Sequence, residues 1–147
     1  MSVRLSGPPP HVGGSRLDKR LLRTRAQRIL RSLDCGGAEL SLSLADDAAI
    51  RELNVGYRGI PRPTDVLSFS LVDGECSEHR RDLLGDVVIG IETAARQARE
   101  RHRGLDEEVA RLLIHGVLHL LGHDHEEPEA ARLMRAEQRR IWRALQG

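Results

Sequence analysis

Leu-Leu-Ile-His-Gly-Val-Leu-His-Leu-Leu-Gly-His-Asp-His, residues 112–125, carries the strongest structural signal in this chain. His115 and His119 are four residues apart in an otherwise apolar run, so a helix would place both imidazoles one turn apart on one face. Gly122 predicts the end of that helix, because glycine is the usual residue just past a helix end. A chain that turns there can bring His125 back toward the same point. The stretch therefore predicts a helix that ends beside three imidazoles.

A divalent metal ion is the partner that these imidazoles predict, because it satisfies all of them at once, whereas burying them without partners costs free energy. Three protein ligands with an open fourth position are typical of a catalytic zinc site. We therefore expect His115, His119 and His125 to hold one Zn²⁺ per chain, although other first-row divalent ions accept the same ligands. His123 would join the pair only if the helix continued through Gly122, so we interpret it as a neighbour.

The spacing of the three histidines is also that of the metzincin peptidases, H-E-x-x-H-x-x-G-x-x-H. Gly116 stands where those enzymes have the Glu that acts as general base, which removes the simplest peptidase mechanism. The same segment resembles the signature of the YbeY family of metal-dependent endoribonucleases, H-G-x-L-H-L-x-G-[YH]-D-H. Every fixed position of that signature fits the stretch from His115 to His125.

Further segments carry the same resemblance. Residues 53–59 and 63–69 are similar to the family pattern L-N-x-x-[YF]-R-x-K-D-x-P-T-D-V-L-S-F-P, and residues 84–89 match its L-G-D-[IV]-[VA]-I element. Two departures are visible, since Ile60-Pro61 replace the Lys-Asp pair and Ser70 replaces the final Pro. The resemblance covers roughly residues 38–135 and implies a zincin-like fold with about four strands.

Length and composition predict one globular domain over residues 1–147. Hydrophobic residues make up 39% of the chain and charged residues 31%, which is typical of a soluble protein. No stretch approaches the ~20 apolar residues of a membrane span, and no apolar signal core opens the chain, so we expect a cytoplasmic protein. Cys35 and Cys76 are isolated in the sequence, which fits a reducing compartment.

The distribution of charge is more informative than the net charge of +1. Arginines crowd residues 16–31 and 132–143. Arginine pairs bidentately with phosphate, so a phosphate-rich partner is one interpretation and solvated helix faces are the other. The chain has one Phe, one Tyr and one Trp, which nearly excludes aromatic platforms for base stacking.

Hydrophobic periodicity and turn residues predict the order of elements. Residues 1–15 are expected to form a loose arm in which Val3–Leu5 could make a short strand. The remaining expectations are helices over 17–33, 46–55, 92–103 and 106–121 and from 127 onward, strands over 38–44, 64–70 and 84–90, and loops over 56–63 and 72–82. Asp106 is expected to cap the histidine-bearing helix, which should be the central buried one. This order predicts an α+β domain with a small mixed sheet packed with helices.

The expected nucleophile is a metal-bound water, because a divalent ion held by neutral imidazoles lowers the pKa of that water toward ~7. Asp124 could orient a histidine or accept a proton, and it could equally be a helix-end turn residue. The family match places Arg58 beside the metal, where it would stabilise the non-bridging oxygens of a phosphodiester, and Arg62 could assist it. Structural roles are expected for three further residues, Asp65, Ser68 and Asp86.

The resemblance implies a single-strand-specific, metal-dependent endoribonuclease that matures the 3′ end of 16S rRNA and acts in late-stage 70S ribosome quality control. Single-stranded rRNA and the ribosome or its small subunit would be its partners. Two alternatives remain open. One is a small zinc metallopeptidase-like hydrolase, motivated by the histidine spacing. The other is a ribosome-assembly binding factor with a structural metal, motivated by the arginine-rich helices and the lack of an obvious general base.

Overall fold

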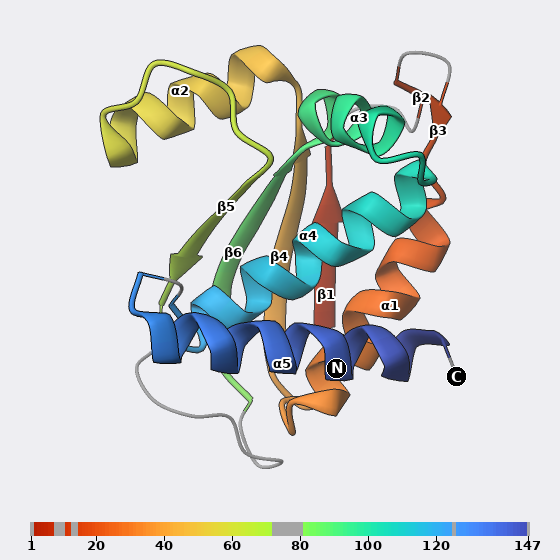
Figure 1. Ribbon diagram of the computed structural model, residues 1–147, viewed down its shortest axis with the longest axis vertical. Helices are drawn as coiled ribbons and strands as arrows, with labels where there is room; N and C mark the ends of the chain where they lie inside the picture. The colour runs from red at the N-terminus through yellow and green to blue at the C-terminus, as the bar shows by residue number, and fades with distance from the viewer. Residues whose placement is uncertain (1, 8–10, 13–14, 72–80, 125, 147) are drawn as a thin grey trace.

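The computed structural model describes residues 2–7, 11–12, 15–71, 81–124 and 126–146. A four-stranded sheet and five helices make up most of it (Figure 1). The strands are β1 (Ser2–Ser6), β4 (Glu39–Ala45), β5 (Val66–Ser70) and β6 (Leu83–Gly90), with a separate two-stranded ribbon of β2 (His11–Val12) and β3 (Ser15–Arg16). The helices are α1 (Lys19–Ser32), α2 (Asp47–Arg58), α3 (Ile91–Glu100), α4 (Leu105–Leu120) and α5 (Pro128–Gln146).

The sheet is mixed, as the sequence predicts. Its strand order is β1-β4-β6-β5, with β1, β4 and β6 parallel and β5 antiparallel to β6. Successive side chains of β5 point to opposite faces of the sheet, so neighbouring residues of this strand pack into two different hydrophobic clusters. Val66 packs against the main core cluster, whereas Leu67 belongs to a smaller cluster with Ile50 of α2.

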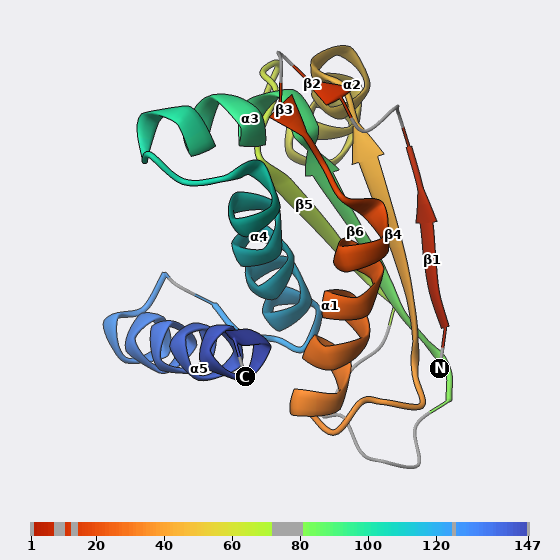
Figure 2. The same ribbon diagram turned by 90° about the vertical axis from the view of Figure 1, so that its right-hand side faces the viewer.

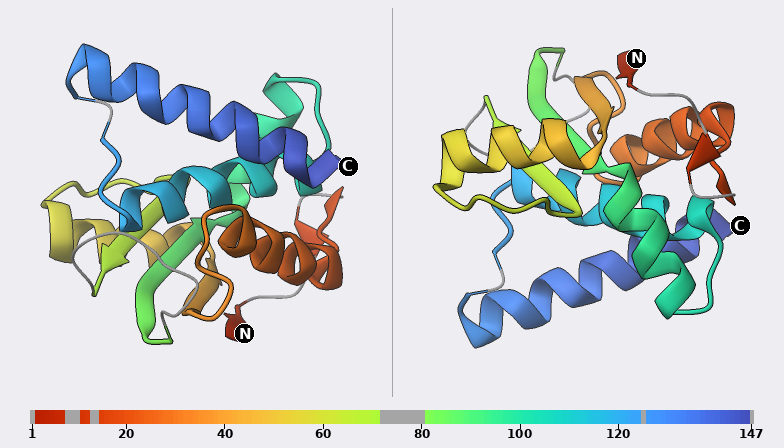
Figure 3. Two further views of the ribbon diagram at one scale, coloured as in Figure 1. Left: turned by 90° about the horizontal axis from the view of Figure 1, so that it is seen from below. Right: turned by 90° about the horizontal axis from the view of Figure 1, so that it is seen from above.

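Helices α1 and α4 cover one face of the sheet, and α5 packs on their outer side (Figure 2). Views from below and above show α5 crossing beside α4 and α1 (Figure 3). The main core lies between the sheet and α1 and α4, and α5 adds buried side chains such as Met134 and Ile141. No helix among the described residues is long and apolar enough to cross a membrane.

Helix α4 is the central buried helix that its apolar pattern predicts, since most of its sixteen residues are buried. Its C-terminal end follows the prediction from Gly122. The backbone N–H of Gly122 donates to the His119 carbonyl at 3.0 Å, and that of His123 donates to the Leu118 carbonyl at 3.0 Å. Together with the φ of 91° at Gly122, this is the glycine-dependent Schellman ending.

The predicted N-cap of α4 is wrong. The helix begins at Leu105 after Gly104, and no side chain caps it. Asp106 lies in the first turn, where its Oδ1 accepts a hydrogen bond from the backbone N–H of Asp18 at 2.8 Å. The Asp106 carboxylate, which the local pattern predicts as the cap of α4, therefore binds the backbone of a distant segment instead.

The end of α2 and one cysteine also differ from expectation. Helix α2 continues through Gly56 to Arg58 and ends at Gly59, whose φ of 68° is left-handed, so the loop expected from residue 56 begins later. The short strand suggested for Val3–Leu5 within the expected arm is present as β1, which pairs in parallel with β4. Cys35 is fully buried and is not a free thiol, which contradicts the expectation of two isolated reduced cysteines. Cys76 lies outside the described residues, as does most of the expected loop over 72–82.

Candidate active site

The two histidines of α4 converge on one point near its C-terminal end. The Nε2 atoms of His115 and His119 lie 3.0 Å apart, and both side chains are half-buried. Their ring centroids are 4.6 Å apart and the ring planes meet at 70°. Helical spacing of four residues thus brings together the two ring nitrogens, as the sequence predicts.

This pair fits a divalent metal ion. Two nitrogens bound at ~2.0–2.1 Å in tetrahedral geometry would lie about 3.3 Å apart, close to the observed separation. The described residues contain no group of three His, Cys, Asp or Glu side chains placed to share an ion. His125 lies outside the described residues, so the prediction that it is the third ligand stays a prediction.

The other ring nitrogen of His115 contacts α5. The Nδ1 atom lies 2.7 Å from the side-chain nitrogen of Gln138. If Nε2 of His115 binds a metal, Nδ1 carries the hydrogen, and the amide must then present its oxygen instead, by a rotation that leaves the backbone unchanged. Gln138 therefore has the position of a residue that orients a metal ligand through its second nitrogen.

Gly116 faces the sheet and leaves no room for a side chain. A Cβ atom there would lie 2.8 Å from Cγ1 of Val87 and 3.2 Å from Oγ of Ser68. Ser68 donates from that Oγ to the Gly116 carbonyl at 2.8 Å, and Ser70 makes a similar bond to the Leu120 carbonyl at 3.0 Å. Ser68 thus has the structural role expected of it, and the glutamate that serves as general base in metzincins has no space at position 116.

Arg58 reaches the same cavity as the histidines. A cavity of about 640 Å³ is lined by Arg58, His115, His119 and Asp124, together with residues of β5 and the segment before it. Arg58 is the last residue of α2 and is exposed. Arg62 is also exposed and does not line this cavity in the described part of the chain. The structure therefore brings together Arg58 and the histidine pair, as expected, and leaves Arg62 apart.

Asp124 lines the cavity but is also engaged locally. Its Oδ1 accepts a hydrogen bond from the backbone N–H of Glu126 at 3.0 Å, which is an Asx-type turn after α4. This is the helix-end role that the sequence left open for Asp124. Asp124 also lines the cavity, and Oδ1 alone takes part in the turn. Its expected role in orienting a histidine or accepting a proton stays a prediction.

Gln138 was missed by sequence reasoning, although a signal for it exists. Helix α5 buries Met134, Ile141 and Leu145 on one face. Gln138 is four residues after Met134 and three before Ile141, so it is a polar residue in the middle of an apolar stripe. A polar interruption of this kind indicates that the packed face meets a polar partner, which here is His115.

The fold and site define a class of protein: an α+β enzyme-like domain in which a buried helix presents paired imidazoles to a cavity that also holds an arginine. Comparison with known proteins gives the family. The model of the family described as Endoribonuclease YbeY matches residues 15–146, and the chain belongs to that family of RNA-hydrolysing enzymes.

Individual relatives agree with this assignment. The chain is similar to an Endoribonuclease YbeY of Syntrophus aciditrophicus, with 41% identity over 90% of this chain and 84% of the relative. It is also similar to one of Anaeromyxobacter sp., with 46% identity over 98% of this chain and 72% of the relative. The solution structure of a protein from Thermotoga maritima matches 97% of this chain and 88% of that chain, with a TM-score of 0.68 and 26% identity.

Proposed function

We propose that this chain is a single-strand-specific, metal-dependent endoribonuclease that acts on rRNA during ribosome biogenesis. Its substrates would include the 3′ end of 16S rRNA, and it would take part in late-stage 70S quality control. The observation that carries the proposal is the convergence of two imidazole Nε2 atoms, 3.0 Å apart, in one cavity with Arg58. Membership of the Endoribonuclease YbeY family supports RNA as the substrate.

Each residue has a distinct task in this proposal. His115 and His119 would hold the ion with His125, most simply Zn²⁺, and Gln138 would fix the orientation of the His115 ring. When bound, the ion supplies a water molecule whose pKa is lowered toward ~7. Arg58 would contact the non-bridging phosphate oxygens, where negative charge grows in the transition state. Asp124 would hold or accept a proton at Oδ2, the carboxylate oxygen that does not accept the hydrogen bond from the Glu126 backbone.

The metallopeptidase alternative loses its simplest mechanism, because the position of the peptidase base is occupied by a glycine packed against Val87 and Ser68. The binding-factor alternative is favoured by the arginines of α5 and makes a different prediction. It expects that loss of the histidine pair leaves ribosomal RNA binding and maturation intact in a folded protein.

The test compares metal content and cleavage of single-stranded and duplex rRNA fragments for the wild type, His119→Ala and His123→Ala. His123 is a matched control, because it is four residues beyond His119 and the turn at Gly122 removes it from the helix. We expect His119→Ala to lose both bound metal and cleavage while circular dichroism shows an intact fold. His123→Ala should keep both. Equal RNA cleavage by the folded His119→Ala protein would contradict the proposal.

A further inference from the structure

Helix α5 carries two kinds of arginine. Arg132 pairs with Glu129, and Arg140 pairs with Glu137 at 2.7 Å, each within one helical turn. The hydrogen bond to Glu137 also raises the pKa of Arg140 above its ordinary value. The other three, Arg135, Arg139 and Arg143, are exposed and form no ion pair with any residue that the structure describes.

These three arginines follow one another at steps of four residues, so they lie along one face of α5, roughly 6 Å apart along the helix axis. Like charges at this spacing weaken a helix. The stripe of Arg135, Arg139 and Arg143 therefore does not serve the stability of α5, and its charge is available to a partner.

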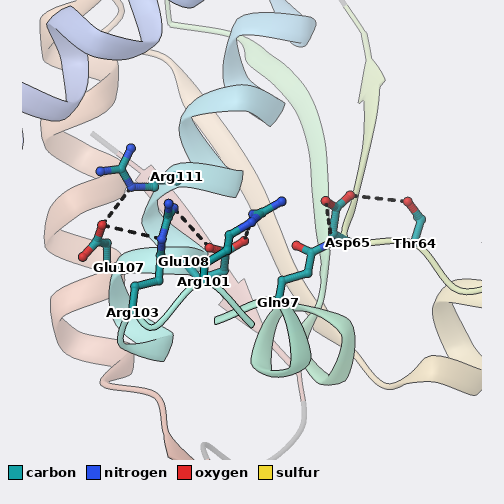
Figure 4. Close-up of polar contacts among 8 residues, drawn as sticks. All are labelled: Thr64, Asp65, Gln97, Arg101, Arg103, Glu107, Glu108 and Arg111. Atoms are coloured by element: carbon teal, nitrogen blue, oxygen red, sulfur yellow. Dashed lines mark hydrogen bonds and ion pairs between the residues drawn. The ribbon is translucent and has the colours of Figure 1, made fainter. Parts of the chain in front are cut away.

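The stripe borders a cavity of about 560 Å³ between α4 and α5. The acidic side chains beside this cavity are already engaged (Figure 4). Glu108, which is 1% exposed, pairs with Arg101 at 2.6 Å and with Arg103 at 3.2 Å. Glu107 pairs with Arg111 at 3.0 Å.

Asp65 also lines the cavity, and its carboxylate accepts hydrogen bonds from Thr64 and Gln97, as the close-up in Figure 4 shows. The engaged acids leave the three stripe arginines as uncompensated positive charge on the cavity wall.

The cavity leads to the candidate active site. Asp65, Val66 and His115 line both this cavity and the one that contains Arg58. Gln138, which contacts Nδ1 of His115, lies on the wall between the stripe and the histidine. A ligand that follows the stripe toward α4 therefore arrives at His115.

We propose that Arg135, Arg139 and Arg143 form a phosphate-binding track that holds the backbone of a single-stranded RNA on its way to His115. The inference rests on the proposed function and names a binding surface for its substrate. A regular row of guanidinium groups matches a polymer that repeats one phosphate per nucleotide, and each can hold phosphate bidentately. The track reads no base, in agreement with the scarcity of exposed aromatic side chains.

The test measures binding without cleavage. A short 2′-O-methyl oligoribonucleotide, which lacks the free 2′-hydroxyl, is titrated into the full chain after chelation of metal, at several salt concentrations. Anisotropy of a dye on the oligonucleotide reports binding. The emission of Trp142, the one tryptophan of the chain, gives a second signal, because this ring lines the cavity with the Arg111 guanidinium 4.4 Å from its centroid.

Arg139→Ala is compared with Arg132→Ala, which removes the same charge from an exposed position on the same helix. We expect Arg139→Ala to weaken binding severalfold, and the triple variant R135A/R139A/R143A to weaken it roughly tenfold or more. The slope of log K against log salt should fall in magnitude by about 2 in the triple variant, since each lost phosphate contact on a single strand removes ~0.7. Arg132→Ala should leave affinity and slope at wild-type values.

Three results would overturn the inference. Unchanged affinity and slope in the triple variant, while RNA cleavage still depends on His119, would remove the track and leave the proposed function standing. Equal losses in Arg132→Ala and Arg139→Ala would show only general charge attraction. Tighter binding of poly-glutamate than of the oligonucleotide would assign the stripe to an acidic protein.

Discussion

The Nδ1 atom of His115 and the side-chain nitrogen of Gln138 lie 2.7 Å apart and join α4 to α5 at the candidate active site. We predict that Gln138→Leu lowers zinc affinity about 10- to 100-fold, because the imidazole loses the partner that fixes its tautomer and orientation. Gln138→Glu should keep or raise affinity, since a carboxylate accepts the Nδ1 hydrogen more strongly. Competition with a chromophoric chelator measures both values. Equal affinities for the Leu and Glu variants would show that the contact plays no part in metal binding.

Arg58 is predicted to act on the reaction and not on the metal. Arg58→Ala should reduce cleavage of single-stranded RNA roughly 10²- to 10³-fold, as expected when a donor to developing negative charge is removed. Metal content should stay at the wild-type level, because Arg58 donates no ligand. Arg62→Ala, which changes an exposed arginine outside the cavity, is the comparison. Normal cleavage by Arg58→Ala would refute the role given to it.

Substitution by Ala is predicted to lower the stability of the fold at Gly116 and to raise it at Gly56. Gly116→Ala should destabilise the fold by about 1–3 kcal/mol, since its Cβ would lie 2.8 Å from Val87. Gly56→Ala should stabilise it by about 0.5–1 kcal/mol, because this glycine is inside α2 and a Cβ there meets nothing within 4 Å. Urea unfolding of both variants measures the difference. A neutral Gly116→Ala protein would mean that α4 packs less closely on the sheet than described.

The effects of substituting Arg101 and Arg103 on stability are predicted to be coupled, because both arginines pair with the buried carboxylate of Glu108. Arg101→Ala or Arg103→Ala alone should cost about 1 kcal/mol, because the other guanidinium still compensates the buried charge. Removing both should cost about 3–5 kcal/mol, more than the sum, since it leaves the charge of Glu108 uncompensated. A double-mutant cycle by chemical denaturation measures this coupling. Simple additivity would show that Arg101 and Arg103 stabilise Glu108 independently of each other.

The parts of the fold that sequence predicted are those with strong local signals. The apolar run around His115 and His119, followed by Gly122, determines where α4 is buried and where it ends. Alternating apolar residues likewise located β4, where Leu40, Leu42 and Leu44 are buried. The local pattern is sufficient to predict such elements. An apolar face has to be buried, and a backbone with positive φ favours glycine, so few other conformations fit these segments.

The parts that sequence did not predict depend on contacts between distant segments. Asp106 bonds to the backbone of Asp18 instead of capping α4, and nothing near Asp106 in sequence indicates this. Gln138 meets His115 across 23 positions, and only the polar gap in the apolar stripe of α5 hints at it. The separation of the α5 arginines into paired and unpaired sets required the actual placement of Glu129 and Glu137.

The most direct test of the central claim is cleavage of single-stranded rRNA by one wild-type sample before metal removal, after chelation and after return of Zn²⁺. We predict that cleavage stops when the metal is removed and recovers when about one equivalent per chain is restored, as the proposed three-imidazole site requires. The fold should persist throughout by circular dichroism. Undiminished cleavage by the folded, metal-free protein would contradict the account, because the reaction would then not depend on a metal ion held by the histidines.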